Sequence, residues 1–176
     1  HTIMPGTEYY QPVDDYSMDY LRRALFGTLA GPLPIHPDHP LEPLSGGRAT
    51  GVLCGGNLSL LAASLGTPWE IDTRNKILFL EDIGEHIYRI DGMLTQLRNA
   101  GKFRDCAGVL LGDWTDCTPE DPERTLTLHQ LFEELILPAG VPVIANLPCG
   151  HSLPSMALPL GAVLSMDADS PALELC

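Results

Sequence analysis

Three short segments of the chain combine residue types that suit hydrolytic chemistry, and each follows an apolar run. They are Gly55-Gly56-Asn57, Glu81-Asp82 and Cys149-Gly150-His151. Histidine exchanges protons near neutral pH and therefore suits a general base. A carboxylate such as that of Glu81 can orient the imidazole and stabilise the imidazolium. Glycines before a helix leave backbone N–H groups unhindered, so the first segment predicts a cradle for an anion or carboxylate.

Each segment also has a plainer structural interpretation. A single histidine such as His151 is more often a surface or capping residue, and we expect that role for the other five histidines. A carboxylate after a strand favours the positive end of the following helix, which suits Asp82 and Glu85 at least as well as Glu81. Spacing alone does not rank Glu81 far above Glu85. The Gly-Gly-Asn segment is also typical of a tight turn with Asn57 as a helix cap.

No nucleophile with a recognisable setting accompanies these groups. The sequence contains no G-x-S-x-G elbow, and the nearest segment, Gly150-His151-Ser152, continues into Leu153-Pro154. Cys149 lies two positions from His151, which leaves a thiol hydrolase as one interpretation. A buried, inert cysteine fits better, because no cation or helix start beside Cys149 would stabilise a thiolate.

The elements that must position these residues alternate along the chain. Short apolar runs predict buried strands at 49–54, 76–80, 107–111 and 141–145. Helical spacing of apolar residues predicts helices at 14–27, at 58–65, from Ile87 to Leu97, and after a Thr127/Gln130 capping box. A closing hairpin is expected from 162–166 and 172–175, and the proline-rich segment 32–43 is expected to be an extended loop.

This alternation predicts an α/β fold with a largely parallel central sheet and an antiparallel edge. In such sheets ligands gather at the carboxyl ends of the strands. The Gly-Gly-Asn, Glu-Asp and Cys-Gly-His segments all follow strands, so the fold would bring them to one edge.

Composition excludes several classes of partner. The net charge is -13 with only 10 Lys and Arg, which argues against nucleic acid and against anionic membrane surfaces. No apolar stretch approaches the roughly 20 residues of a membrane helix. The five cysteines include no C-x-x-C pair and the spacing of His36 and His39 is a poor metal signal, so no metal site or disulfide framework is expected. Reduced cysteines are typical of a cytosolic protein.

Four longer segments carry a resemblance to a known family. In order they are GGNLSLLAASLGTPWEID, KILFLEDIGEHIYRIDGMLTQLRNAGKF, GVLLGDWTDC and VPVIANLPCGHSLPSMALPLGA. Together they closely resemble the serine LD-carboxypeptidases of murein recycling, also called muramoyltetrapeptide carboxypeptidases, to which the microcin C immunity peptidases are related. The resemblance runs from residue 51 to about residue 166.

The resemblance implies a carboxy-terminal domain of the swivelling β/β/α type, which supplies Glu and His to a serine held by an amino-terminal domain. The acid then falls at Glu81 of FLED and the base at His151 of CGHS, while Asn57, with Gly55 and Gly56, lines the substrate pocket. Residues 1–48 are assigned to the interdomain connection, first helix and proline-rich loop, and residues 49–176 to the carboxy-terminal domain, both in one folded unit.

The family reaction removes terminal D-alanine from murein tetrapeptide and requires no metal or organic cofactor. The resemblance also implies a cytoplasmic homodimer and a chain that is inactive without its serine-bearing domain. Two alternatives stay open: an immunity-type peptidase that accepts a peptidyl-nucleotide, and a non-catalytic module that binds a peptide carboxylate at Gly55-Gly56-Asn57. A binding module would keep its affinity after joint replacement of Glu81 and His151 by alanine.

Overall fold

The computed structural model describes residues 1–4, 13–119, 121 and 123–176. In this part of the chain, the strands form one sheet in the order β1-β8-β7-β3-β4-β5-β6-β2. Their bounds are β1 Gly31–Pro32, β2 Glu42–Ser45, β3 Arg48–Asn57, β4 Lys76–Ile83, β5 Gly108–Thr115, β6 Val143–Ala145, β7 Val163–Asp167 and β8 Ala172–Leu175.

The centre of the sheet is parallel, as expected. Strands β3, β4, β5 and β6 pair in parallel, whereas β7, β8, β1 and β2 pair antiparallel at the two sides. The continuous apolar run of β4 is fully buried from Ile77 to Leu80 because both faces of the sheet are covered. The α/β fold class with a largely parallel central sheet is confirmed.

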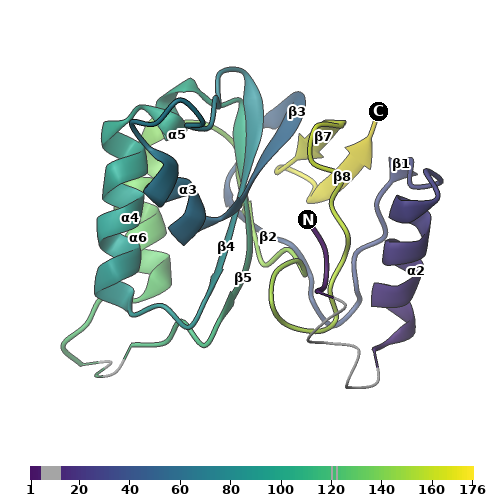
Figure 1. The fold of residues 1–176 in the computed structure, drawn as a ribbon, viewed down its shortest axis with the longest axis horizontal. Coiled ribbons are helices and arrows are strands. Elements are labelled where there is room, and N and C mark those ends of the chain that lie inside the picture. The colour runs from purple at the N-terminus through teal and green to yellow at the C-terminus, as the bar shows by residue number, and fades with distance from the viewer. Residues whose placement is uncertain (5–12, 120, 122) are drawn as a thin grey trace.

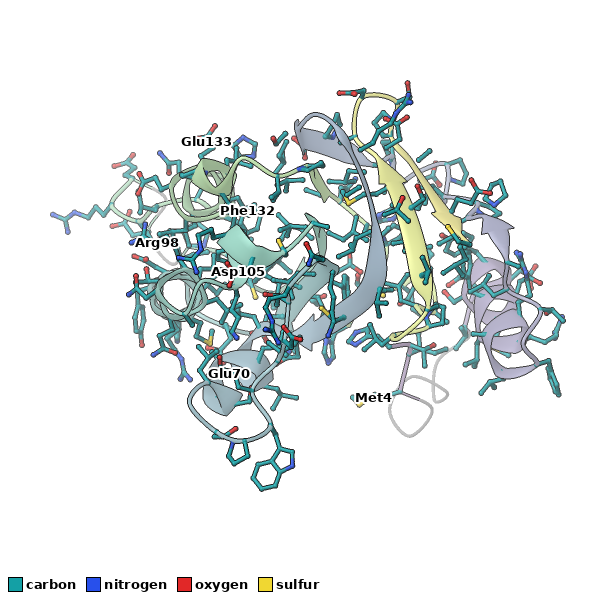
Figure 2. All side chains as sticks on the ribbon, turned by 90° about the horizontal axis from the view of Figure 1, so that it is seen from above. Met4, Glu70, Arg98, Asp105, Phe132 and Glu133 are labelled. Atoms are coloured by element: carbon teal, nitrogen blue, oxygen red, sulfur yellow. The ribbon has the colours of Figure 1, made fainter. Side chains whose placement is uncertain are left out.

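Helices cover one face of this centre (Figure 1). They are α3 Leu58–Ser64, α4 Ile87–Asn99, α5 Lys102–Asp105 and α6 Leu128–Leu135, and α6 continues into the short 3-10 turn Leu137–Ala139. The predicted caps are present: the Asn57 side chain accepts from the Leu60 N–H, and Thr127 and Gln130 form a capping box. In Figure 2, adjacent residues Phe132 and Glu133 lie on the inner and outer sides of α6.

The opposite face is covered by helix α2 (Asp15–Leu25), the β7–β8 hairpin and the loop that follows β6 (Figure 1). Asp14 caps α2, because its side chain accepts a hydrogen bond from the backbone N–H of Ser17. The buried residues of α2 are Ser17, Tyr20 and Leu21, whereas Leu25 is exposed, so only part of the expected apolar stripe faces the core. The β7–β8 hairpin is confirmed.

The prediction of a plain loop over 32–43 is wrong at both ends of that segment. Pro32 belongs to β1 and Pro43 to β2, which are the two outermost strands of the sheet. Proline has no N–H to donate, so within a sheet it is tolerated in an edge strand. The proline-rich segment also lacks the alternation of apolar residues by which a strand is recognised. Strands β4 and β5 also extend beyond their apolar runs, so that Glu81 and Asp113 lie inside strands.

No helix among the described residues combines the length and apolar character needed to cross a membrane. All five cysteines are free thiols.

Candidate active site

Glu81 and His151 are in direct contact at the carboxyl edge of the parallel strands. Nδ1 of His151 lies 2.8 Å from Oε2 of Glu81. Glu81 is on β4 and is fully buried, whereas His151 is in the loop after β6 and is partly exposed. With Nδ1 engaged by the carboxylate, Nε2 is the ring nitrogen left to exchange a proton.

The environment of Glu81 is unusual for a carboxylate. Burial raises its pKa, and the hydrogen bond from His151 acts in the opposite direction. Its second oxygen, Oε1, has no hydrogen-bond partner among the described residues. A buried carboxylate with one oxygen bonded to an imidazole is the arrangement that fixes a tautomer and stabilises an imidazolium.

A cleft of about 580 Å³ opens beside this pair. Its described lining combines the Glu81–His151 pair with glycines and aliphatic side chains: His1, Thr2, Met4, Gly55, Gly56, Asn57, Leu60, Leu61, Glu81, Gly150 and His151. In Figure 2, Met4 lies apart from the helical layer, at the border of the described amino-terminal segment. None of these described lining residues is a lysine or arginine.

Gly55, Gly56 and Asn57 line the cleft. Asn57 pairs with Glu81 in the β3–β4 register, which explains why the two segments meet. The Asn57 side chain is already engaged, because its oxygen caps α3 and its Nδ2 donates to Asp82. The amide therefore acts mainly as a cap, and the open lining here comes from the two glycines.

The neighbouring acids hold structural partners instead of His151. Asp82 accepts hydrogen bonds from the backbone and hydroxyl of Ser59, which ties β4 to the start of α3. Glu85 forms an ion pair of 2.8 Å with Arg89. The structure thus separates two carboxylates that spacing left equivalent: Glu81 contacts the histidine and Glu85 does not.

His1 is a cleft residue that the sequence interpretation missed. Its Nε2 lies 3.8 Å from Oε1 of Glu81, and its ring packs edge-on against Phe79 at 5.2 Å between centroids. Sequence spacing gave no signal for it, because His1 precedes every predicted element.

Cys149 does not have the setting of a nucleophile. It is fully buried, and burial raises the pKa of its thiol well above the ordinary range. Residues of the described chain form no cluster of three or more His, Cys, Asp or Glu that could hold a metal. The arrangement therefore supplies an acid–base pair and a cleft.

Comparison with known families decides the assignment. The LD-carboxypeptidase C-terminal domain matches residues 50–166. The chain belongs to this family. The match includes the segments that carry Asn57, Glu81 and His151.

Two proteins similar to this LD-carboxypeptidase domain are named for murein peptides. A probable murein peptide carboxypeptidase of Bacillus subtilis (strain 168) is 50% identical over 128 residues, which are 73% of this chain and 40% of the relative. A muramoyltetrapeptide carboxypeptidase from Oxalobacter formigenes has a similar structure, with a TM-score of 0.80 and 25% identity over 99% of this chain and 59% of that one.

A second similar structure is that of MccF, the microcin C7 self-immunity protein, in complex with glutamyl sulfamoyl guanosine. The TM-score is 0.69 at 25% identity, and the match covers 78% of this chain and 41% of the MccF chain. The chain spans less than two thirds of the length of each of these three proteins.

Proposed function

We propose that this LD-carboxypeptidase domain supplies the acid and base of a serine carboxypeptidase that removes terminal D-alanine from murein tetrapeptide. The observation that carries the proposal is the 2.8 Å contact between Nδ1 of His151 and Oε2 of Glu81 at the wall of the cleft. The names of the Bacillus and Oxalobacter relatives support the substrate class.

In the proposed mechanism, Nε2 of His151 takes the proton from a serine hydroxyl as that oxygen attacks the scissile carbonyl. Glu81 accepts the Nδ1–H bond throughout, holds the ring in one tautomer and stabilises the imidazolium. The same histidine then returns the proton to the leaving amine of D-alanine. The second half of the reaction repeats these steps with water in place of the serine.

The resemblance to the family implies a serine outside these 176 residues, and among the described residues the nearest candidates are otherwise engaged: Cys149 is fully buried and the Ser152 hydroxyl donates to Asp113. We therefore infer that the chain alone is inactive and that an amino-terminal, serine-bearing domain completes the site. The described lining of the cleft contains no lysine or arginine, and we also assign recognition of the D-alanine carboxylate largely to that domain. A homodimer in the cytoplasm is the assembly and location that the resemblance implies.

The test compares the intact protein that contains these residues with the 176-residue chain. We expect the intact protein to release D-alanine from murein tetrapeptide, as measured by a coupled D-amino-acid oxidase assay, and the short chain to release none. D-alanine release by the short chain at the intact rate would contradict the assignment of the serine to another domain. No release by the intact protein would contradict the substrate class.

A peptidyl-nucleotide is the second candidate substrate, favoured by the similarity to MccF, whose structure contains glutamyl sulfamoyl guanosine. The acid–base chemistry would be the same, and only the group beyond the scissile bond would differ. Parallel assays with murein tetrapeptide and with a peptidyl-adenylate analogue separate the two: a higher kcat/KM for the nucleotide would favour the immunity-type function.

A further inference from the structure

The loop that carries His151 has no regular secondary structure between β6 and β7. A catalytic histidine on such a loop needs fixed anchors, because a displacement of about 1 Å can cost on the order of 100-fold in rate. The bond to Glu81 fixes one ring atom only. The position of the loop backbone must be set by other contacts.

One residue of β5, Asp113, holds the loop on both sides of His151. Its backbone N–H donates to the carbonyl oxygen of Cys149 at 2.9 Å. Its carboxylate oxygen Oδ2 accepts a hydrogen bond of 2.6 Å from the hydroxyl of Ser152. His151 thus lies between two loop residues, Cys149 and Ser152, that are both hydrogen-bonded to Asp113.

Gly150 allows the loop to lie this close to the strand. A Cβ atom at Gly150 would be 2.8 Å from Cβ of Asp113 and 3.3 Å from Oε2 of Glu81. Any side chain here would therefore push the loop away from both carboxylates. The close approach of the loop to Asp113 and the bond between His151 and Glu81 depend on the same glycine.

A β-bulge brings Asp113 to this position. In the β4–β5 register Leu80 pairs with Leu111 and Asp82 with Trp114, so Glu81 alone lies opposite Gly112 and Asp113. The extra residue changes the alternation of β5, since Leu111 and Trp114 both pack against the helix-side core although they are three positions apart. Bulges occur next to active sites, where they redirect a side chain.

The carboxylate of Asp113 forms no salt bridge with the described residues. Burial raises the pKa of its carboxyl, and the Ser152 hydroxyl opposes this change as a donor. Glu81, His151 and His39 are the other titratable groups that act on it. A short bond to a neutral hydroxyl fixes the loop without bringing a competing cation to the histidine.

We propose that Asp113 and Ser152 are positioning residues that hold the backbone of the His151 loop so that Nδ1 reaches Glu81. This inference rests on the proposed function of His151 as the base. It assigns a role to a strand-end carboxylate that lies outside the acid–base pair.

The test replaces Ser152 by alanine and by threonine. In the 176-residue chain, 15N-detected NMR of the His151 ring should show the Nδ1–H tautomer in the wild type and a mixture of tautomers in Ser152→Ala. In the intact protein, Ser152→Ala should lower kcat for D-alanine release about 10- to 100-fold with KM changed less than about twofold. Ser152→Thr, which keeps the hydroxyl, should restore both.

Thr73→Val is the matched control. Its hydroxyl also donates a buried hydrogen bond, to the carbonyl oxygen of Lys102, and Thr73 precedes β4, at the opposite end of that strand from Glu81. It should lower stability without changing the tautomer or kcat. An unchanged tautomer and kcat in Ser152→Ala would overturn the proposal. Because the NMR reading needs no catalysis, a tautomer change without any D-alanine release would support the positioning role and count only against the proposed function.

Discussion

Asn57 and Glu81 are direct partners across strands β3 and β4, and this pairing explains how three distant segments form one site. It sets Gly55 and Gly56, the β3 residues before Asn57, beside the buried carboxylate. His151, 70 residues after Glu81, then closes the cleft from the loop beyond β6. Parallel strands place their carboxyl ends at one edge, so the site follows from the topology.

The first prediction concerns the pH dependence of stability. Because burial raises the pKa of Glu81, the folded state binds a proton more readily than the unfolded state. Protonation of Glu81 therefore stabilises the folded state. This stabilisation is fully present below the ordinary carboxyl pKa and is lost as pH rises through the raised pKa of the folded state. Glu81→Gln should remove this loss and raise the unfolding free energy at neutral pH by about 1 kcal/mol.

Urea unfolding over a series of pH values measures the effect. Asp72→Asn is the control of opposite sign. Hydrogen bonds from Arg74 lower the pKa of the Asp72 carboxyl, so its ionised form stabilises the fold and this stabilisation is lost as pH falls. Equal pH slopes for the wild type and Glu81→Gln would show that the burial of Glu81 carries no such cost.

The second prediction concerns Gly55. Its φ is +125°, and a Cβ atom there would overlap the carbonyl oxygen of Phe79 and lie 2.7 Å from its nitrogen. Gly55→Ala should therefore destabilise the fold by about 3 kcal/mol or more, because backbone strain and steric overlap add. Gly66 also has a positive φ, +77°, but no atom lies within 4 Å, so Gly66→Ala should cost only about 1 kcal/mol. Chemical denaturation gives both values, and equal costs would refute the close β3–β4 contact.

The third prediction concerns thiol reactivity. Cys176 is exposed, whereas Cys149 is fully buried and burial raises its thiol pKa. Iodoacetamide at neutral pH should label Cys176 first and Cys149 only after unfolding, as read by peptide mass spectrometry. The Cys176→Ser variant provides the control, since it should lose the fast label. Rapid labelling of native Cys149 would revive the thiol-hydrolase interpretation.

The fold was largely predictable because its central strands are continuous apolar runs and its helices carry clear caps. Asn57 and Thr127 both cap the helices assigned to them. The edge strands were missed because Pro32 and Pro43 interrupt any alternation, and their pairing depends on distant partners. No local pattern marks a strand of this kind.

The site was predictable in part. Strand ends located Glu81 and His151, but distinguishing Glu81 from Glu85 required three-dimensional contacts, since only Glu81 reaches the histidine. Asp113 lies two residues beyond the predicted strand 107–111, and no local pattern gave it a role. The bulge that presents it arises from the β4–β5 register, which spacing does not encode.

The most direct test of the central claim is D-alanine release from murein tetrapeptide by the intact protein and three single variants. If His151 and Glu81 act as base and acid, His151→Ala should slow kcat about a thousandfold or more and Glu81→Gln should slow it at least about a hundredfold. Glu85→Gln, which removes the charge that pairs with Arg89 and leaves the Glu81–His151 contact intact, should stay within about threefold of the wild type. Nearly full activity in His151→Ala would contradict the account and make the Glu81–His151 contact structural.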